Sequence, residues 1–184
     1  IAPLTPDDSS TGENTGMPAK ALRMIDRIDQ LSFEGGIHEN GYIKAVKAVD
    51  PAEWFFDAHF YQDPVCPGSL GIESFLQMLR FFLIQKFDIQ PDHWEACLPD
   101  NQTHEWIYRG QIIPANKSID IHAHIIDCSG DDNQMSVSAD GALVVDGICI
   151  YEMKQFTAGF INPESLCRRG PASGKTLALK KESE

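Results

Sequence analysis

A histidine and a glutamate flank a turn rich in proline and glycine near the middle of the chain. His59 is followed by Pro64, Pro67 and Gly68, and Glu73 comes shortly after them. Proline restricts the backbone and glycine permits sharp turns, so a rigid turn separates a candidate base from a candidate acid. This arrangement predicts an active site.

The residue types at this turn suit an elimination reaction. A neutral imidazole at His59 can take a proton from a carbon next to a carbonyl. Glu73 can protonate a leaving hydroxyl, because an apolar surrounding favours the neutral carboxyl group. Gln77 follows one helical turn later, where its amide can hold that carboxyl. The backbone N–H of Gly68, at a helix start, can stabilise an enolate-like oxygen.

The run after Pro67 predicts the helix that positions Glu73. It contains no further proline until Pro91, and apolar residues cover nearly its whole circumference, as in a buried helix. These residues are Leu70, Ile72, Phe75, Leu76, Met78, Leu79, Phe81, Phe82, Leu83, Ile84 and Phe87. Charged and amide side chains interrupt the run too often for a membrane span.

The segments 50–60 and 63–71 around His59 resemble the β-hydroxyacyl-acyl carrier protein dehydratases of fatty acid synthesis. They are most similar to the branch with the β-hydroxydecanoyl thioester dehydratase/isomerase and the dehydratase domains of polyunsaturated fatty acid synthases. Weaker similarity runs from Met24 through residues 108–114 to about Phe160. The resemblance implies an α+β hot-dog fold, in which a curved antiparallel sheet wraps a long central helix.

The family pattern also implies a role for each residue of the turn. His59 would be the catalytic base, Glu73 the acid, and Gly68 the source of the oxyanion N–H. Gln77 would orient Glu73, and the carbonyl of Val65 would hold the ring of His59. In this family the histidine and the carboxylate come from two hot-dog units, so we expect a homodimer or a second hot-dog domain.

Four further residues are expected to line the substrate site: Phe60, Cys66, Pro67 and Ser69. Cys66 stands where methionine is common in the family, and Ser69 stands where the isomerase has cysteine. Neither change removes a catalytic group. Glu73 replaces the aspartate of the isomerase, as in the branch that only dehydrates, so the resemblance predicts dehydration and does not extend to isomerisation.

The composition limits which classes of binding partner and which cellular compartment we expect. The net charge of -12 disfavours nucleic acid and anionic membranes. Five scattered cysteines and no signal peptide predict reduced thiols in the cytoplasm. The predicted chemistry needs no metal or diffusible cofactor, and the substrate would arrive on the phosphopantetheine of an acyl carrier protein. Candidate contacts for that acidic carrier are Lys44, Lys47, Arg80, Lys86 and Arg109.

Composition also divides the chain into three parts. Residues 1–18 predict a linker or disordered segment, residues 19–161 the dehydratase domain, and residues 162–184 a second linker or disordered tail. The chain begins with Ile1 and has linker composition at both ends, which predicts a domain taken from a multidomain synthase.

Alternating residues predict the strands of the sheet. Residues 42–49 are expected to form a hairpin with the segment before them, and residues 105–113, 118–128, 134–145 and 148–156 a meander. Residues 91–102 predict a polar loop, and Asp146-Gly147 a tight turn. His122 and His124 are expected on the outer face without a metal. The aromatic cluster at residues 54–56 is expected to pack in the core.

Three functions remain open from the sequence. The first is a dehydratase that converts β-hydroxyacyl thioesters into trans-2-enoyl thioesters in fatty acid or polyketide synthesis. The second is a catalytically silent hot-dog unit that completes a pseudo-dimer, although the presence of both His59 and Glu73 argues against it. The third is a hot-dog thioesterase, which the proline and glycine pattern after His59 does not favour.

Overall fold

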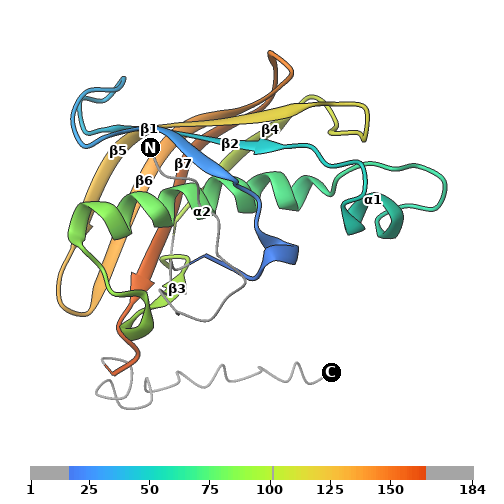
Figure 1. Ribbon diagram of the computed structural model, residues 1–184. Helices are drawn as coiled ribbons and strands as arrows, with labels where there is room; N and C mark the ends of the chain where they lie inside the picture. The colour runs from blue at the N-terminus through green and yellow to red at the C-terminus, as the bar shows by residue number, and fades with distance from the viewer. Residues whose placement is uncertain (1–16, 101, 165–184) are drawn as a thin grey trace, which may run out of the picture.

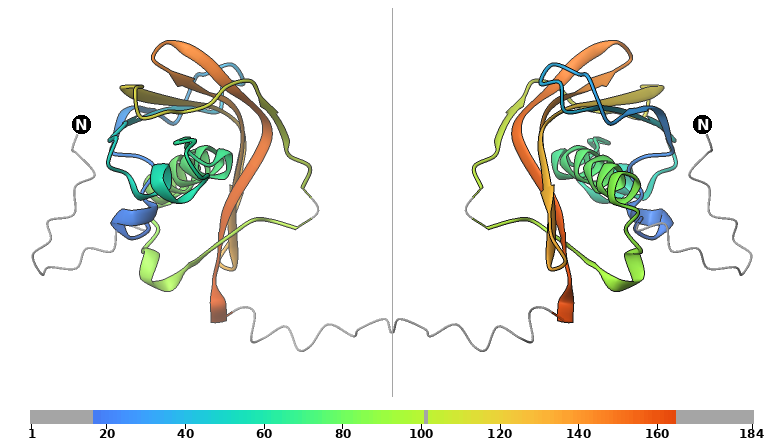
Figure 2. Two further views of the ribbon diagram at one scale, coloured as in Figure 1. Left: turned by 90° about the vertical axis from the view of Figure 1, so that its right-hand side faces the viewer. Right: turned by 90° about the vertical axis from the view of Figure 1, so that its left-hand side faces the viewer.

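One long helix lies against the inner side of a strongly curved antiparallel sheet (Figure 1). The computed structural model describes residues 17–100 and 102–164. Figure 2, which looks along the helix α2 (Gly68–Phe87), shows the sheet curling around it. This is the predicted α+β hot-dog fold. The predicted linkers at 1–18 and 162–184 fall mostly on residues 1–16 and 165–184, outside the described residues.

The sheet contains seven strands in the order β1-β2-β5-β6-β7-β3, and β4 also pairs with β7. The strands are β1 (Arg27–Ser32), β2 (Tyr42–Ala48), β3 (Glu95–Cys97), β4 (Glu105–Tyr108), β5 (Ser118–Gly130), β6 (Gln134–Val145) and β7 (Ile148–Ile161). Three short helices, η1 (Lys20–Leu22), α1 (Trp54–Ala58) and η2 (Pro91–His93), complete the described elements. The predicted hairpin is the antiparallel pair β1 and β2.

Two strand predictions are wrong. The expected strand 105–113 is only β4, and it pairs with the first part of β7 instead of joining the meander. The expected polar loop 91–102 contains β3, which pairs with the last residues of β7. In both cases β7 provides the edge: β4 pairs with residues 151–154, and β3 pairs with residues 159–161, where β7 extends beyond its predicted end.

The core forms where α2 meets the sheet. The helix side chains Phe75, Met78, Leu79, Phe82 and Leu83 are completely buried. On β5, Ile119, Ile121, Ala123 and Ile125 alternate inward, as their period of two predicts. Each large side chain in this core contributes about 1.5 to 3 kcal/mol by leaving water. The helix that carries Glu73 is therefore held firmly along its length.

The turn at Asp146-Gly147 confirms the hairpin predicted there. Both residues have positive φ, 48° and 87°, which is the backbone of a type I′ turn. The carboxylate of Asp146 accepts hydrogen bonds from Asn116 Nδ2 and from the backbone N–H groups of Lys117 and Ser118. These bonds, the one from Asn116 first, lower the pKa of Asp146.

His122 and His124 lie on the outer face of β5, as predicted, and each takes part in a local contact. His122 Nδ1 lies 2.8 Å from the hydroxyl of Tyr42. The backbone N–H of Ile37 donates to His124 Nδ1 over 3.2 Å. The first contact ties β5 to β2, and the second ties β5 to the segment between β1 and β2. Within residues 17–100 and 102–164, no group of three or more metal-ligating side chains is arranged to hold an ion.

Candidate active site

His59 stands at the end of α1, a helix whose apolar side chains anchor it. Its backbone N–H donates to the carbonyl of Phe55 over 3.1 Å and so caps the helix. Phe55 and Phe56 are buried, as expected for core packing, whereas Trp54 is 47% exposed, and for Trp54 that prediction is wrong. Because these two phenylalanines are buried, they fix the backbone at His59 and with it the place of the imidazole.

The ring of His59 is oriented by the backbone of Val65. Nδ1 lies 3.1 Å from the Val65 carbonyl oxygen. A carbonyl only accepts, so Nδ1 carries the hydrogen in this bond and Nε2 keeps its lone pair. The carbonyl is itself fixed, because the next N–H, that of Cys66, donates to the Ile112 carbonyl over 2.9 Å. The ring of Phe60 packs against the imidazole at a centroid distance of 4.0 Å.

Gly68 is the first residue of α2, directly after Pro67. No side chain caps this helix start, so its first N–H groups have no such partner in the described chain. A Cβ atom at Gly68 would lie 3.1 Å from the ring of Trp106 and 3.5 Å from that of Tyr108. The two aromatic rings of β4 therefore border the predicted oxyanion position, which the sequence did not indicate.

Glu73 receives two hydrogen bonds on the same oxygen. Gln77 Nε2 donates to Oε1 over 2.9 Å, and Arg80 Nη1 donates to it over 3.3 Å. The contact with Gln77 has the spacing of one helical turn that the sequence indicates. The sequence predicted an apolar surrounding for Glu73 with the amide of Gln77 beside it. Arg80 was not predicted there, and its guanidinium places a charge beside the carboxyl.

His59 and Glu73 have separate sets of partners. The ring of His59 contacts Val65 and Phe60, and the carboxyl of Glu73 contacts Gln77 and Arg80. Among the described residues, no hydrogen bond or ion pair joins the base to the acid. Each of the two predicted catalytic residues is therefore held by its own neighbours.

The residues expected to line the substrate site differ in accessibility. Phe60 and Ser69 are exposed, and Pro67 is half-buried. Cys66 is buried, and this burial, followed by the charge of Glu53, raises the pKa of its thiol to about 12. A thiol that stays protonated at neutral pH is a poor nucleophile, so we do not expect Cys66 to act as one, and its role as a lining residue stays a prediction.

Four of the five cations expected to face a carrier protein are already in ion pairs. Lys44 pairs with Asp120, Arg80 with Glu73 and Arg109 with Glu152. Lys47 is only 7% exposed and pairs with Glu53 over 2.7 Å. A buried, paired lysine cannot meet a docking protein, so the prediction for Lys47 is wrong.

In comparisons with known proteins, the chain matches a family model and a curated relative. Residues 17–154 match the family model of the FabA-like domain. The chain is 38% identical over 136 residues to one of the subunits of a polyunsaturated fatty acid synthase from Thraustochytrium sp.. That match covers 70% of this chain but 9% of the relative, so the chain spans a small part of that protein's length.

Solved structures share the fold at low identity. The dehydratase heterocomplex ApeI:P from Xenorhabdus doucetiae has a TM-score of 0.57 at 11% identity, covering 84% of this chain and 94% of that one. A hypothetical thioesterase with coenzyme A from Streptococcus pneumoniae has a TM-score of 0.44 at 7% identity, covering 73% and 83%. The similarity to the ApeI:P heterocomplex supports the fold, whereas the similarity to the thioesterase is too distant to support an argument.

Proposed function

Because the chain belongs to the family of FabA-like domains, we propose that it removes water from β-hydroxyacyl thioesters to give trans-2-enoyl thioesters. The substrate would be carried on the phosphopantetheine of an acyl carrier protein during fatty acid or polyketide synthesis. One observation carries the proposal: in this family member, the His59 ring and the Glu73 carboxyl are each held by the partner that the chemistry needs.

His59 acts as the base in this proposal. With its Nδ1–H donated to the Val65 carbonyl, Nε2 is free to accept the proton from C2 of the substrate. The same bond stabilises the imidazolium that forms, because the carbonyl oxygen faces the protonated ring. The Gly68 N–H, at the uncapped start of α2, would donate to the thioester oxygen as negative charge develops on it.

Glu73 acts as the acid. Oε1 is occupied by two groups that can only donate, Gln77 Nε2 and Arg80 Nη1, so a proton taken up by the carboxylate before the reaction would bind to Oε2. That proton passes to the hydroxyl on C3 as the C3–O bond breaks and the C2–C3 double bond forms. Water leaves, and both proton transfers are completed without a cofactor.

A second hot-dog unit completes the site in this proposal. His59 and Glu73 are unconnected within the described chain, and each would face the other residue from a partner, either a second copy or another domain. The 9% coverage of the synthase relative fits a domain of a larger protein, in which a tethered carrier would dock in spite of the net charge of -12.

The proposed setting is cytoplasmic. Cys66, Cys97, Cys128 and Cys149 are free thiols, as a reducing compartment favours, and Cys167 lies outside the described residues. None of the helices in residues 17–100 and 102–164 has the length and hydrophobicity of a transmembrane span.

Enoyl formation tests the proposed function. The purified chain is incubated with β-hydroxyacyl pantetheine thioesters of several chain lengths, and loss of water is followed by mass spectrometry. We expect activity in the wild type and in His93→Ala, an exposed histidine that serves as the control, but none in His59→Ala. A dimeric wild type that dehydrates no chain length would favour the silent pseudo-dimer unit. Release of free acid instead would favour the thioesterase.

A further inference from the structure

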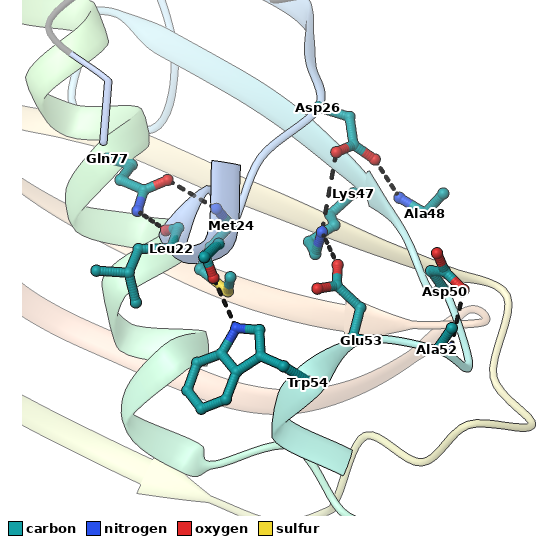
Figure 3. Close-up of polar contacts among 11 residues, drawn as sticks. Leu22, Met24, Asp26, Lys47, Ala48, Asp50, Ala52, Glu53, Trp54 and Gln77 are labelled. Carbon is teal, nitrogen blue, oxygen red and sulfur yellow. Dashed lines mark hydrogen bonds and ion pairs between the residues drawn. The ribbon is translucent and has the colours of Figure 1, made fainter. Parts of the chain in front are cut away.

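We propose that the segment of residues 20–26, called here the N-terminal strap, positions Glu73 for catalysis, and that Trp54 holds this strap in place. Figure 3 shows the two sets of contacts, with Gln77 on one side of the strap and Trp54 on the other. The inference rests on the proposed function, since it concerns the acid of that reaction. It makes Trp54 a positioning residue that acts through the strap.

The strap fixes the amide of Gln77. The backbone N–H of Met24 donates to Gln77 Oε1 over 2.9 Å, and Gln77 Nε2 donates to the Leu22 carbonyl over 2.8 Å. The second hydrogen of Nε2 is donated to Glu73. Gln77 is 1% exposed, so water cannot replace these partners. Rotating the amide by 180° would place an N–H against Met24 N–H and an oxygen against two acceptors. The strap therefore decides which end of the amide faces Glu73.

Trp54 closes the strap from the opposite side. Its indole Nε1–H donates to the Ala21 carbonyl over 2.7 Å, one residue before the Leu22 carbonyl that Gln77 uses. The side chain is 47% exposed, so it contributes less to the core than its neighbours Phe55 and Phe56 do. A half-exposed tryptophan with a short hydrogen bond to a distant backbone is better explained by holding that backbone than by packing.

The far end of the strap is anchored to β2. The backbone N–H of Asp26 donates to the Val46 carbonyl over 2.9 Å. The Asp26 carboxylate accepts from the N–H of Ala48 over 2.7 Å, as Figure 3 shows. Lys47 Nζ lies 3.9 Å from the same carboxylate. With this end fixed, the indole of Trp54 and the amide of Gln77 restrain the outer end, where residues 19–22 are exposed.

The contacts form one path from the helix of the base to the carboxyl of the acid. Trp54 is the first residue of α1, and His59 is the C-cap of that helix. The hydrogen bond of Trp54 leads through Ala21 and Leu22 to Gln77 and then to Glu73. Without the indole N–H, the strap can move and the amide of Gln77 can lose its single orientation. Misplacing a catalytic group slightly is enough to lower kcat.

A double-mutant cycle tests this path in the full chain. Trp54→Phe removes the N–H and keeps an aromatic ring, and we expect it to lower kcat about 10-fold with KM unchanged. In a Gln77→Ala background the same substitution should cost little, because the path is already broken. Trp94→Phe is the matched control, since Trp94 lies after η2, outside the strap and its contacts, and kcat should not change. Equal losses from Trp54→Phe in both backgrounds would overturn the proposal.

Hydrogen exchange tests the strap without any activity. We expect the amide of Met24 to exchange faster in Trp54→Phe and in Gln77→Ala than in the wild type or in Trp94→Phe. If the Met24 amide exchanges at the same rate in Trp54→Phe and in the wild type, the proposal that Trp54 holds the strap is overturned, even if the chain is an active dehydratase. Faster exchange in a chain without dehydratase activity would support the strap and reject the proposed function.

Discussion

Arg80 Nη1 donates to Glu73 Oε1 over 3.3 Å, from two helical turns further along α2. The guanidinium is mostly buried, and its Nε has no partner among the described residues. A permanent cation thus lies against the group proposed to give up a proton. When Glu73 releases that proton, the resulting carboxylate forms beside a positive charge already in place, which lowers the cost of the step.

The first prediction follows from this contact. Arg80→Met removes a charge-assisted hydrogen bond worth about 1.5 to 3 kcal/mol, so we expect kcat to fall about 10-fold or more. Arg80→Lys keeps the charge and should restore part of the loss. Lys86→Met, on the same helix, is the control, because Lys86 lies over the rings of Phe33 and Phe82 and does not contact Glu73. Steady-state kinetics measure the effect, and an unchanged kcat in Arg80→Met would contradict it.

Local patterns predicted much of this molecule from its sequence. The apolar circumference of residues 68–87 predicted α2, the alternation around His122 predicted β5, and Asp146-Gly147 predicted a turn. The contact between Glu73 and Gln77 was also predictable, since residues four apart face each other on a helix.

Contacts between distant segments were not predictable in the same way. Gln77 bonds to Leu22 and Met24, which are 55 and 53 residues away, and no local signal marks such a pair. The partner of β4 was misassigned for the same reason, because strand pairing depends on the whole sheet. Arg80 was taken for a surface cation, since neither charge nor spacing reveals which carboxyl a long side chain will reach.

The second prediction concerns Gly71, where the helix passes close to the sheet. A Cβ atom there would lie 2.1 Å from the ring of Tyr151, whose side chain is 1% exposed and cannot move aside. Alanine favours a helix over glycine by about 1 kcal/mol, but overpacking of a core costs about 1 to 3 kcal/mol. Because the clash of 2.1 Å is severe, we expect the cost to exceed the gain, so that Gly71→Ala lowers the free energy of unfolding by up to about 2 kcal/mol. Urea unfolding measures this, and Gln85→Ala at an exposed position of α2 is the control. A Gly71→Ala variant that is more stable than the wild type would contradict this prediction and show that the ring of Tyr151 moves to make room for the added Cβ atom.

The third prediction is a loss of stability in mild acid. Burial lowers the pKa of His122 and of His124, assisted by the positive charges of Lys44 and His38 respectively. The unfolded chain then binds these protons more tightly than the folded one does. The free energy of unfolding is therefore highest above the pKa of histidine in the unfolded chain, about 6.5. It declines as the pH falls through the lower pKa values of the two histidines in the folded chain.

Two asparagines test this pH dependence. His122→Asn with His124→Asn places an amide near each Nδ1 contact and removes the titration, so we expect a flatter decline of unfolding free energy between neutral and mildly acidic pH. His93→Asn is the control, because His93 is exposed on η2 and should leave the profile unchanged. Denaturant unfolding across the pH range provides the measurement. A double variant with the wild-type slope would assign the acid sensitivity to other groups.

The last prediction concerns the proposal that a second hot-dog unit completes the site. If His59 of one chain works with Glu73 of another, a mixed dimer of His59→Ala and Glu73→Gln chains contains one site with both changes and one intact site. Random mixing places half of the chains in such dimers, so about one quarter of the wild-type activity should return although each variant alone is inactive. Dehydration assays after unfolding and refolding the two variants together measure this, with native mass spectrometry to count mixed dimers. If mixed dimers form and stay inactive, base and acid do not meet between two copies of this chain, and the partner unit must be a different domain.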